Sequence, residues 1–178
     1  MVLLDNLNRK AFTIIELVVV IAIIGVLATV VAVSVQNYVV KAKGTRIAQD
    51  LKTIETALIL LKTTQGISIW PRENTNGWSA TIKDISGIGE FLSTSILPPP
   101  PLNTSPYSYD NDGDLMGASG CCAGVNIYIY NTTYAPKYFD IVDDIIDNGD
   151  GSSSGRIRSL SGNAYIMYNL ATKEDLSY

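Results

Sequence analysis

An unbroken apolar run near the N-terminus is the strongest pattern in this sequence. Residues 14–35 are almost all aliphatic, interrupted by one carboxylate, Glu16, and by small hydroxyl residues. The roughly 24 residues of segment 12–35 would form a helix of about 36 Å, which exceeds the roughly 30 Å hydrocarbon core of a bilayer. Because lipid offers the backbone no other hydrogen-bond partner, a single spanning segment must be helical. The pattern therefore predicts a transmembrane helix over residues 12–35.

The helical pattern continues beyond the apolar run. Over residues 36–66, apolar side chains recur at intervals of four and three residues and charged side chains fill the other positions, which is typical of an amphipathic helix. Gly66 is the expected stop, so the whole helix is predicted from Phe12 to about Thr64. A short coiled coil is the alternative interpretation of the apolar stripe, which consists of Ile47, Leu51, Ile54, Leu58 and Leu61.

The remaining residues, 67–178, are predicted to form a globular head. Proline and glycine breakers make residues 67–106 an irregular connection, with a short helical turn at residues 84–92. Strands are predicted at residues 125–130, 138–142 and 164–170, and short connections favour antiparallel pairing. The apolar face of this sheet needs a cover, and the stripe is available. The predicted fold class is therefore α+β, a long N-terminal helix packed by its C-terminal half on a small antiparallel β-sheet.

Two basic residues predict how the apolar helix is oriented. Arg9 and Lys10 directly precede the run, and the positive-inside rule then places the N-terminus in the cytoplasm and the head outside. The formal net charge of the whole chain is −4. A chain of this charge gives no indication of nucleic-acid binding.

Glu16 is the anomaly in the apolar run. A charged side chain inside a spanning helix is costly and usually has a partner. If the chain were cut just before Phe12, the new α-amino group would lie about one helical turn from Glu16. The amine and the carboxylate could then neutralise each other, within one chain or between neighbouring chains.

The segment around Phe12 and Glu16 resembles the N-terminus of type IV pilins and of the pseudopilins of type II secretion. The resemblance is close over residues 9–35 and implies that residues 1–11 are a leader peptide. It implies cleavage between Ala11 and Phe12 by a prepilin peptidase, and N-methylation of Phe12 by the same enzyme. The family usually has Gly before the cut, and Ala11 is the next smallest residue. The resemblance also implies that Glu16 pairs with the Phe12 amine of an adjacent subunit.

Acidic residues are concentrated in the head between residues 110 and 150. Asp110, Asp112 and Asp114 alternate around a glycine turn, an arrangement that can wrap oxygen ligands around calcium, although the EF-hand pattern is incomplete. Asp147 and Asp150 form a second, weaker candidate for calcium. Some pseudopilins bind calcium in C-terminal loops, so the resemblance also favours calcium binding here. The alternative is that these residues form ordinary Asx turns without a metal. Two nearby bases, Arg156 and Arg158, are expected to pair with these aspartates.

Other chemistry has little support in the sequence. Cys121 and Cys122 are the two cysteines, and a free pair, a vicinal disulfide and bonds to other subunits all remain open. The chain contains no histidine, which argues against a zinc site or a thiol protease. The Gly and Ser residues at 151–155 lack the strand, lysine and helix of a phosphate-binding loop and predict a turn. An enzyme is therefore not expected.

These features together favour a structural subunit of a type IV pilus-like filament. By the resemblance, its partners are further copies of the chain, other pilins, the prepilin peptidase/N-methyltransferase and an inner-membrane assembly platform. The precursor is expected in the inner membrane, and the assembled filament at the cell surface. The Gly-, Ser- and Tyr-rich head favours a pilus pilin, whereas the acid cluster favours the alternative, a pseudopilin. A membrane-anchored binding domain that does not polymerise is the alternative from another functional class.

Overall fold

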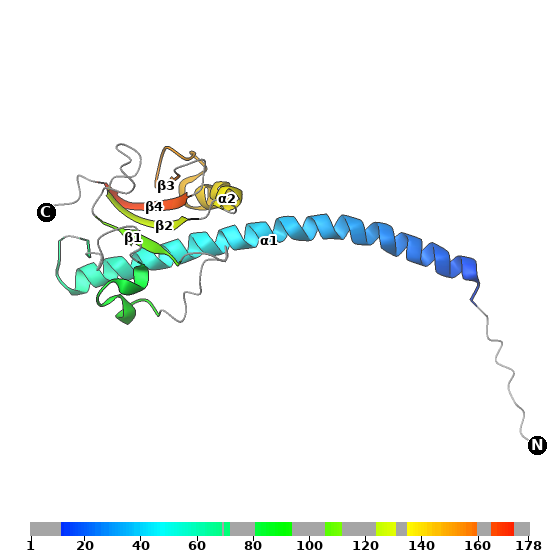
Figure 1. Cartoon of the computed structure of the whole chain (residues 1–178), viewed down its shortest axis with the longest axis horizontal. Coiled ribbons are helices and arrows are strands. Elements are labelled where there is room, and N and C mark those ends of the chain that lie inside the picture. The colour runs from blue at the N-terminus through cyan, green and yellow to red at the C-terminus, as the bar shows by residue number, and fades with distance from the viewer. Residues whose placement is uncertain are drawn as a thin grey trace, which may run out of the picture. The chain divides into compact units, whose positions relative to one another are not determined.

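The chain divides into two compact units, Met1–Val39 and Val40–Tyr178, and Figure 1 shows the order of their elements. The structure is a computed structural model of the whole chain. It describes residues 12–68, 70–71, 81–93, 106–111, 124–130, 135–159 and 165–172.

Helix α1 (Ile14–Thr64) is 51 residues long and contributes to both units. It ends as the sequence predicts, because Gly66 adopts a left-handed conformation with φ of 64°. The N–H groups of Gly66 and Ile67 donate to the carbonyls of Thr63 and Lys62, which satisfies the last turn of the helix in a Schellman motif. The predicted helix is confirmed, and it begins at Ile14 rather than at Phe12.

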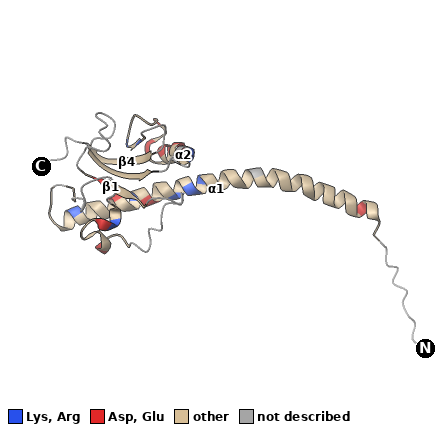
Figure 2. Cartoon of the chain, viewed as in Figure 1, with Lys and Arg blue, Asp and Glu red and all other residues tan. Residues whose placement is uncertain are grey.

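The first unit is described from Phe12 to Val39 and consists mainly of the apolar part of α1. No charged residue occurs in the sequence between Glu16 and Lys41, and the described residues of this part of the helix are tan, without blue or red, in Figure 2. Its large apolar side chains are exposed, from 47% at Val20 to 84% at Ile14. In the described part of the chain, α1 is the one helix long and apolar enough to cross a membrane.

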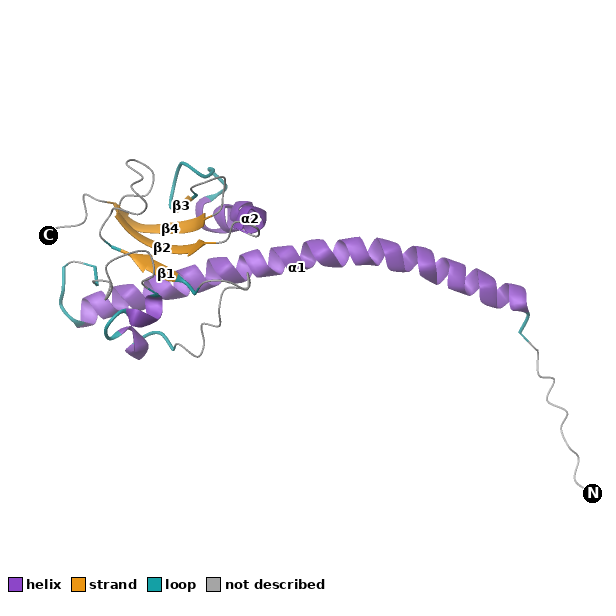
Figure 3. Ribbon diagram, viewed as in Figure 1, coloured by secondary structure: helices purple, strands orange, loops and turns teal. Residues whose placement is uncertain are grey.

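The second unit contains a four-stranded sheet with the order β1-β2-β4-β3, in which all neighbours are antiparallel (Figure 3). The antiparallel sheet is confirmed, as are the strands predicted at residues 125–130 and 164–170. Two short 3-10 helices, η1 (Ile82–Asp84) and η2 (Ile88–Glu90), overlap the helical turn predicted at residues 84–92 at Asp84 and at residues 88–90. The strands are β1 (Ser108–Asp110), β2 (Gly124–Tyr130), β3 (Ile157–Arg158) and β4 (Tyr165–Thr172).

One predicted strand is wrong. Residues 138–142 lie in helix α2 (Ala135–Asp147), because their aromatic and β-branched side chains favour a strand only when the short window is taken alone. Over the longer segment, Phe139, Val142 and Ile146 recur at helical spacing and all contribute to the core. This burial of one helical face overrides the local preference for a strand.

The core of the second unit forms between the second half of α1 and the sheet. The five stripe residues are between 0% and 2% exposed and share one buried cluster with the apolar side chains of β2 and β4. The predicted packing of the helix on the sheet is therefore confirmed. Since the stripe is buried within the chain, it does not form the exposed seam of a coiled coil. The sheet residues of this cluster include Val125, Ile127, Ile129, Ile166 and Tyr168.

A polar cluster ties α1 to the opposite end of the chain. The carboxylate of Glu55 on α1 accepts a hydrogen bond from the Tyr168 hydroxyl of β4 at 2.5 Å and forms an ion pair with Arg156. Lys52 donates to the same hydroxyl at 2.8 Å, and the Arg156 guanidinium lies 4.5 Å from the centre of the Tyr168 ring. Burial alone would raise the pKa of the Glu55 carboxyl, but the bonds from Tyr168 and Arg156 outweigh it and lower that pKa.

Helices α1 and α2 approach closely at Gly44. A Cβ atom placed on Gly44 would lie 2.6 Å from Cγ2 of Ile141, which is well inside normal contact. The absence of a side chain at Gly44 is therefore what permits this helix contact.

We predict that Gly44→Ala destabilises the head by about 1 to 3 kcal/mol, although alanine is the better helix former by about 1 kcal/mol. Thermal unfolding of the full chain in detergent would measure it. Gly25→Ala is the matched control, because no atom lies within 4 Å of a Cβ placed there. A more stable Gly44→Ala protein would show that the two helices are not so close.

We also predict that Glu55→Gln lowers the free energy of unfolding by about 1 to 2 kcal/mol at pH 7. Because the folded pKa of Glu55 is lowered, its contribution is present above the unfolded value near 4.5 and is lost as the pH falls through the folded value. The difference between native and variant chains should thus shrink below about pH 4.5, as measured by urea unfolding. Glu90→Gln, at an exposed glutamate of the head, should change little at either pH. An equal loss at all pH values would contradict the ionic role of Glu55.

Candidate functional site

The start of α1 holds the residues that the sequence marks for processing and assembly. Thr13 and Glu16 form a reciprocal cap: the Glu16 carboxylate accepts hydrogen bonds from the N–H and the hydroxyl of Thr13, each at 2.8 Å. The N–H of Glu16 donates in return to the Thr13 hydroxyl at 3.3 Å. This is the capping-box arrangement, which satisfies otherwise unpaired donors at a helix start. Glu16 is thereby held at the N-terminal end of the helix.

Phe12 precedes this cap and is 80% exposed. The structure thus places Phe12 and Glu16 at the same end of α1, as the sequence predicts. Ala11, on the other side of the predicted cut, lies outside the described residues, as does the rest of the leader. An exposed start of the helix leaves the Phe12 backbone accessible to an enzyme or to another chain.

The apolar surface that follows is large and uncovered within the chain. Exposed aliphatic side chains cover α1 continuously from Leu17 to Val31, with exposed fractions of about one half to two thirds. Contiguous apolar surface of this extent marks a membrane-binding or protein-binding surface. The helix can therefore serve in lipid and, equally, in a bundle of apolar helices.

A second group of polar residues lies at the end of α2. Asp143, Asp147 and Asp150 each offer a carboxylate oxygen, and these oxygens all lie within 4.8 Å of one another. The sequence had pointed to Asp147 and Asp150, and the structure adds Asp143. Residues four apart share a face only in a helix. The incorrect prediction of a strand at residues 138–142 therefore gave no reason to group Asp143 with Asp147.

Asp143 is the most buried of the three, at 2% exposure. Its Oδ2 accepts a hydrogen bond from the N–H of Gly151 at 3.0 Å. Burial raises the pKa of its carboxyl, and the charges of Asp150 and Asp147 raise it further, while the bond from Gly151 opposes them. The group therefore concentrates negative charge at a sheltered position.

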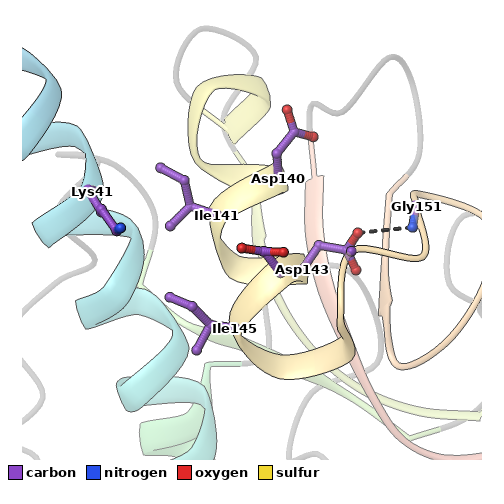
Figure 4. Close-up of a pocket in the computed structure, with 8 residues that line it drawn as sticks. Lys41, Asp140, Ile141, Asp143, Ile145 and Gly151 are labelled. Carbon is purple, nitrogen blue, oxygen red and sulfur yellow. Dashed lines mark hydrogen bonds between the residues drawn. The ribbon is translucent and has the colours of Figure 1, made fainter.

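An open pocket of about 560 Å³ adjoins this group and lies between α1 and α2. Figure 4 shows Ile141 and Ile145 facing Lys41 of α1, whereas Asp143 points to the other side, toward Gly151. The pocket thus has an apolar floor on α2 and a polar margin.

The first predicted calcium group is only partly described. Asp110 ends β1 and is 6% exposed. Its carboxylate accepts a hydrogen bond of 3.4 Å from Asn126 of β2, and Asn169 of β4 donates to Asn126 at 3.0 Å. Asp110 thus takes part in a polar row across three strands. Asp112 and Asp114 lie outside the described residues, as do Cys121 and Cys122, so those expectations stay predictions.

The expected pairing of Arg156 with the neighbouring aspartates is wrong for its guanidinium. That group pairs with Glu55 on α1, and its Nε donates to the carbonyl of Asn169 at 3.3 Å. Only the backbone N–H of Arg156 reaches Asp147. Residues 151–155 form the turn that was predicted there, between α2 and β3.

Comparison with known proteins matches the N-terminal part of the chain. Residues 6–32 match the family model of the prokaryotic N-terminal methylation motif. The chain is 35% identical over 85 residues to the type IV major pilin protein PilE of Neisseria gonorrhoeae, covering 46% of this chain and 48% of that protein. It is 44% identical over 50 residues to the type IV major alpha-pilin of Moraxella bovis, covering 28% and 31%.

The chain thus matches about half the length or less of these curated relatives. No solved structure matches it significantly. The resemblance to type IV pilins is confirmed by these matches, and the motif that carries it includes Phe12 and Glu16.

Proposed function

We propose that this protein is a structural, non-enzymatic subunit of a type IV pilus-like filament. The single observation that carries the proposal is the methylation motif at the exposed start of a long, uncovered apolar helix. Such a helix needs lipid around it before assembly and other helices around it afterwards, because exposure of its aliphatic surface to water is energetically unfavourable. Transfer from the membrane into a bundle of identical helices meets both needs.

In this proposal the precursor resides in the inner membrane with its N-terminus in the cytoplasm. A prepilin peptidase removes residues 1–11, cutting between Ala11 and Phe12, and methylates the new amine. An assembly platform then moves the chain into a filament of its own copies and other pilins, whose outer surface at the cell exterior consists of heads.

The pilus is preferred to a type II secretion pseudopilus because the matched relatives carry the names of major pilins. A membrane-anchored binding domain would need neither the processing motif nor an acid at Glu16. Both features support the filament instead.

The proposed processing step can be tested directly. Intact-mass and N-terminal peptide mass spectrometry of the protein from its own membranes should find a chain that begins at Phe12 and carries one additional methyl group. A matched Ala11→Gly chain should be cut at the same bond, and Phe12→Asp should remain uncut if the enzyme reads this junction. A native chain that still begins at Met1 would overturn the processing step, and with it the filament proposal.

The proposed assembly step can be tested at Glu16, which caps the start of α1 through Thr13 and in this proposal also pairs with a neighbouring subunit. If Glu16 pairs with the Phe12 amine of a neighbour, both Glu16→Ala and Glu16→Gln should insert into the membrane but stay out of filaments. Thr13→Val removes the hydroxyl of the cap and keeps the charge, so it should still enter filaments. Immunoblots of sheared filaments and of membranes measure the partition. Normal incorporation of Glu16→Gln would restrict Glu16 to capping the helix.

A further inference from the structure

The open pocket of about 560 Å³ between α1 and α2 brings both signs of charge together with apolar side chains. Both helical segments that line it belong to the second unit. Its lining includes Lys41 of α1 and, from α2, Asp140, Ile141, Asp144 and Ile145. The two carboxylates are one helical turn apart, as are the two isoleucines, so α2 presents a row of acids beside a row of aliphatic side chains. The pocket therefore offers a cation, two anions and an apolar surface at one place.

Lys41 reaches the pocket because of its place on α1. It lies three residues before Gly44, the position at which α1 touches Ile141 of α2, and residues three apart share a face of a helix. Figure 4 shows Ile141 and Ile145 facing Lys41. The ammonium group thus lies beside the apolar floor of the pocket.

The charged groups of the pocket are available to a ligand. Lys41, Asp140 and Asp144 are exposed, and none of them takes part in an ion pair in the part of the chain that the structure describes. A purely anionic ligand would be repelled by the two carboxylates, and a purely cationic one by Lys41. Complementarity therefore favours a ligand that carries both charges and also has an apolar part.

The position of Lys41 along α1 indicates the source of such a ligand. Lys41 is the first charged residue after Glu16, and the roughly 24 residues between them form about 36 Å of helix. The hydrocarbon core of a bilayer is about 30 Å thick. When the apolar part of α1 spans a bilayer, Lys41 therefore lies at the level of the lipid headgroups.

We propose that this pocket binds a phospholipid whose headgroup carries both a phosphate and a primary amine, as phosphatidylethanolamine does. The ammonium of Lys41 pairs with the lipid phosphate, and the carboxylates of Asp140 and Asp144 accept hydrogen bonds from the lipid amine. Ile141 and Ile145 contact the glycerol and the first methylene groups of the lipid. This role rests on the part of the proposed function that places the apolar helix in a membrane, and it does not depend on whether the chain polymerises.

The test uses the full chain in nonionic detergent micelles and native mass spectrometry. At equal mole fractions, the complex of one chain with one phosphatidylethanolamine should be roughly fivefold more populated than the complexes with phosphatidylcholine and phosphatidylglycerol. The amine of phosphatidylcholine is fully methylated and cannot donate hydrogen bonds, and phosphatidylglycerol has no amine. Equal populations with all three lipids would overturn the proposal.

The free headgroup, O-phosphoethanolamine, distinguishes a lipid from a small phosphate compound. It carries both charges but no apolar part, so it should displace phosphatidylethanolamine only weakly. Full displacement at an equal concentration would assign the pocket to a small phosphate compound and overturn the lipid.

Substitutions separate the roles of the two charges. Lys41→Met removes the ammonium and keeps an apolar side chain, so binding of phosphatidylethanolamine should fall roughly fivefold. Asp140→Asn combined with Asp144→Asn should lose the preference for phosphatidylethanolamine over phosphatidylglycerol, because the partners of the amine are gone. Lys137→Met is the matched control, since it removes an exposed charge from α2 outside the pocket and should leave the preference intact. An unchanged preference in both the Lys41 and the double aspartate variants would refute the assigned residues.

Two further measurements separate this pocket from the rest of the proposed function. Flotation with phospholipid vesicles measures membrane insertion independently of headgroup preference. A chain that inserts but shows no preference would refute the pocket and leave its residence in the membrane intact, whereas a chain that does not insert would refute both. A dimer that forms without lipid and is lost in Lys41→Met would assign the pocket to a second copy of the chain instead.

Discussion

Burial of the α1 stripe against the inner face of β2 and β4 is the contact on which the second unit depends. A sheet of four short strands cannot bury its apolar face alone, and an amphipathic helix cannot bury its own stripe. Each element supplies the cover that the other lacks. Once the helix lies on the sheet, Gly44 is placed against Ile141, and Glu55 meets Arg156 and Tyr168 at the side of the core.

One helix therefore works in two kinds of surroundings. From Leu17 onward its aliphatic side chains cover all sides, which suits lipid or a bundle of similar helices. From Ile47 to Leu61 the apolar residues keep to one side, which suits packing in water. The change from one pattern to the other occurs within the single helix α1. The two parts of the helix therefore differ in their side chains and not in their backbone structure.

The parts of this structure that depend on periodicity could be predicted from the sequence. The extent of α1, its stop at Gly66, the strand around Ile127 and the antiparallel pairing all follow from local pattern and turn chemistry. The identity of α2 could not be read from residues 138–142, because strand-forming residues filled a helix whose periodicity shows only over a longer window. The acidic group was half predicted for the same reason: Asp143 joins it only when α2 is a helix. The pairing of Arg156 with Glu55 could not be predicted from a local sequence pattern, because the two residues are far apart in the chain.

The strand order of the sheet bears on when the head can fold during synthesis. β4 is the last of the described elements in the chain, yet it lies between β2 and β3 and carries Ile166 and Tyr168 into the core. The stripe of α1 is made by the ribosome long before the strand that covers it. Contacts between such distant segments form slowly, and the core of the head cannot close until β4 has been synthesised.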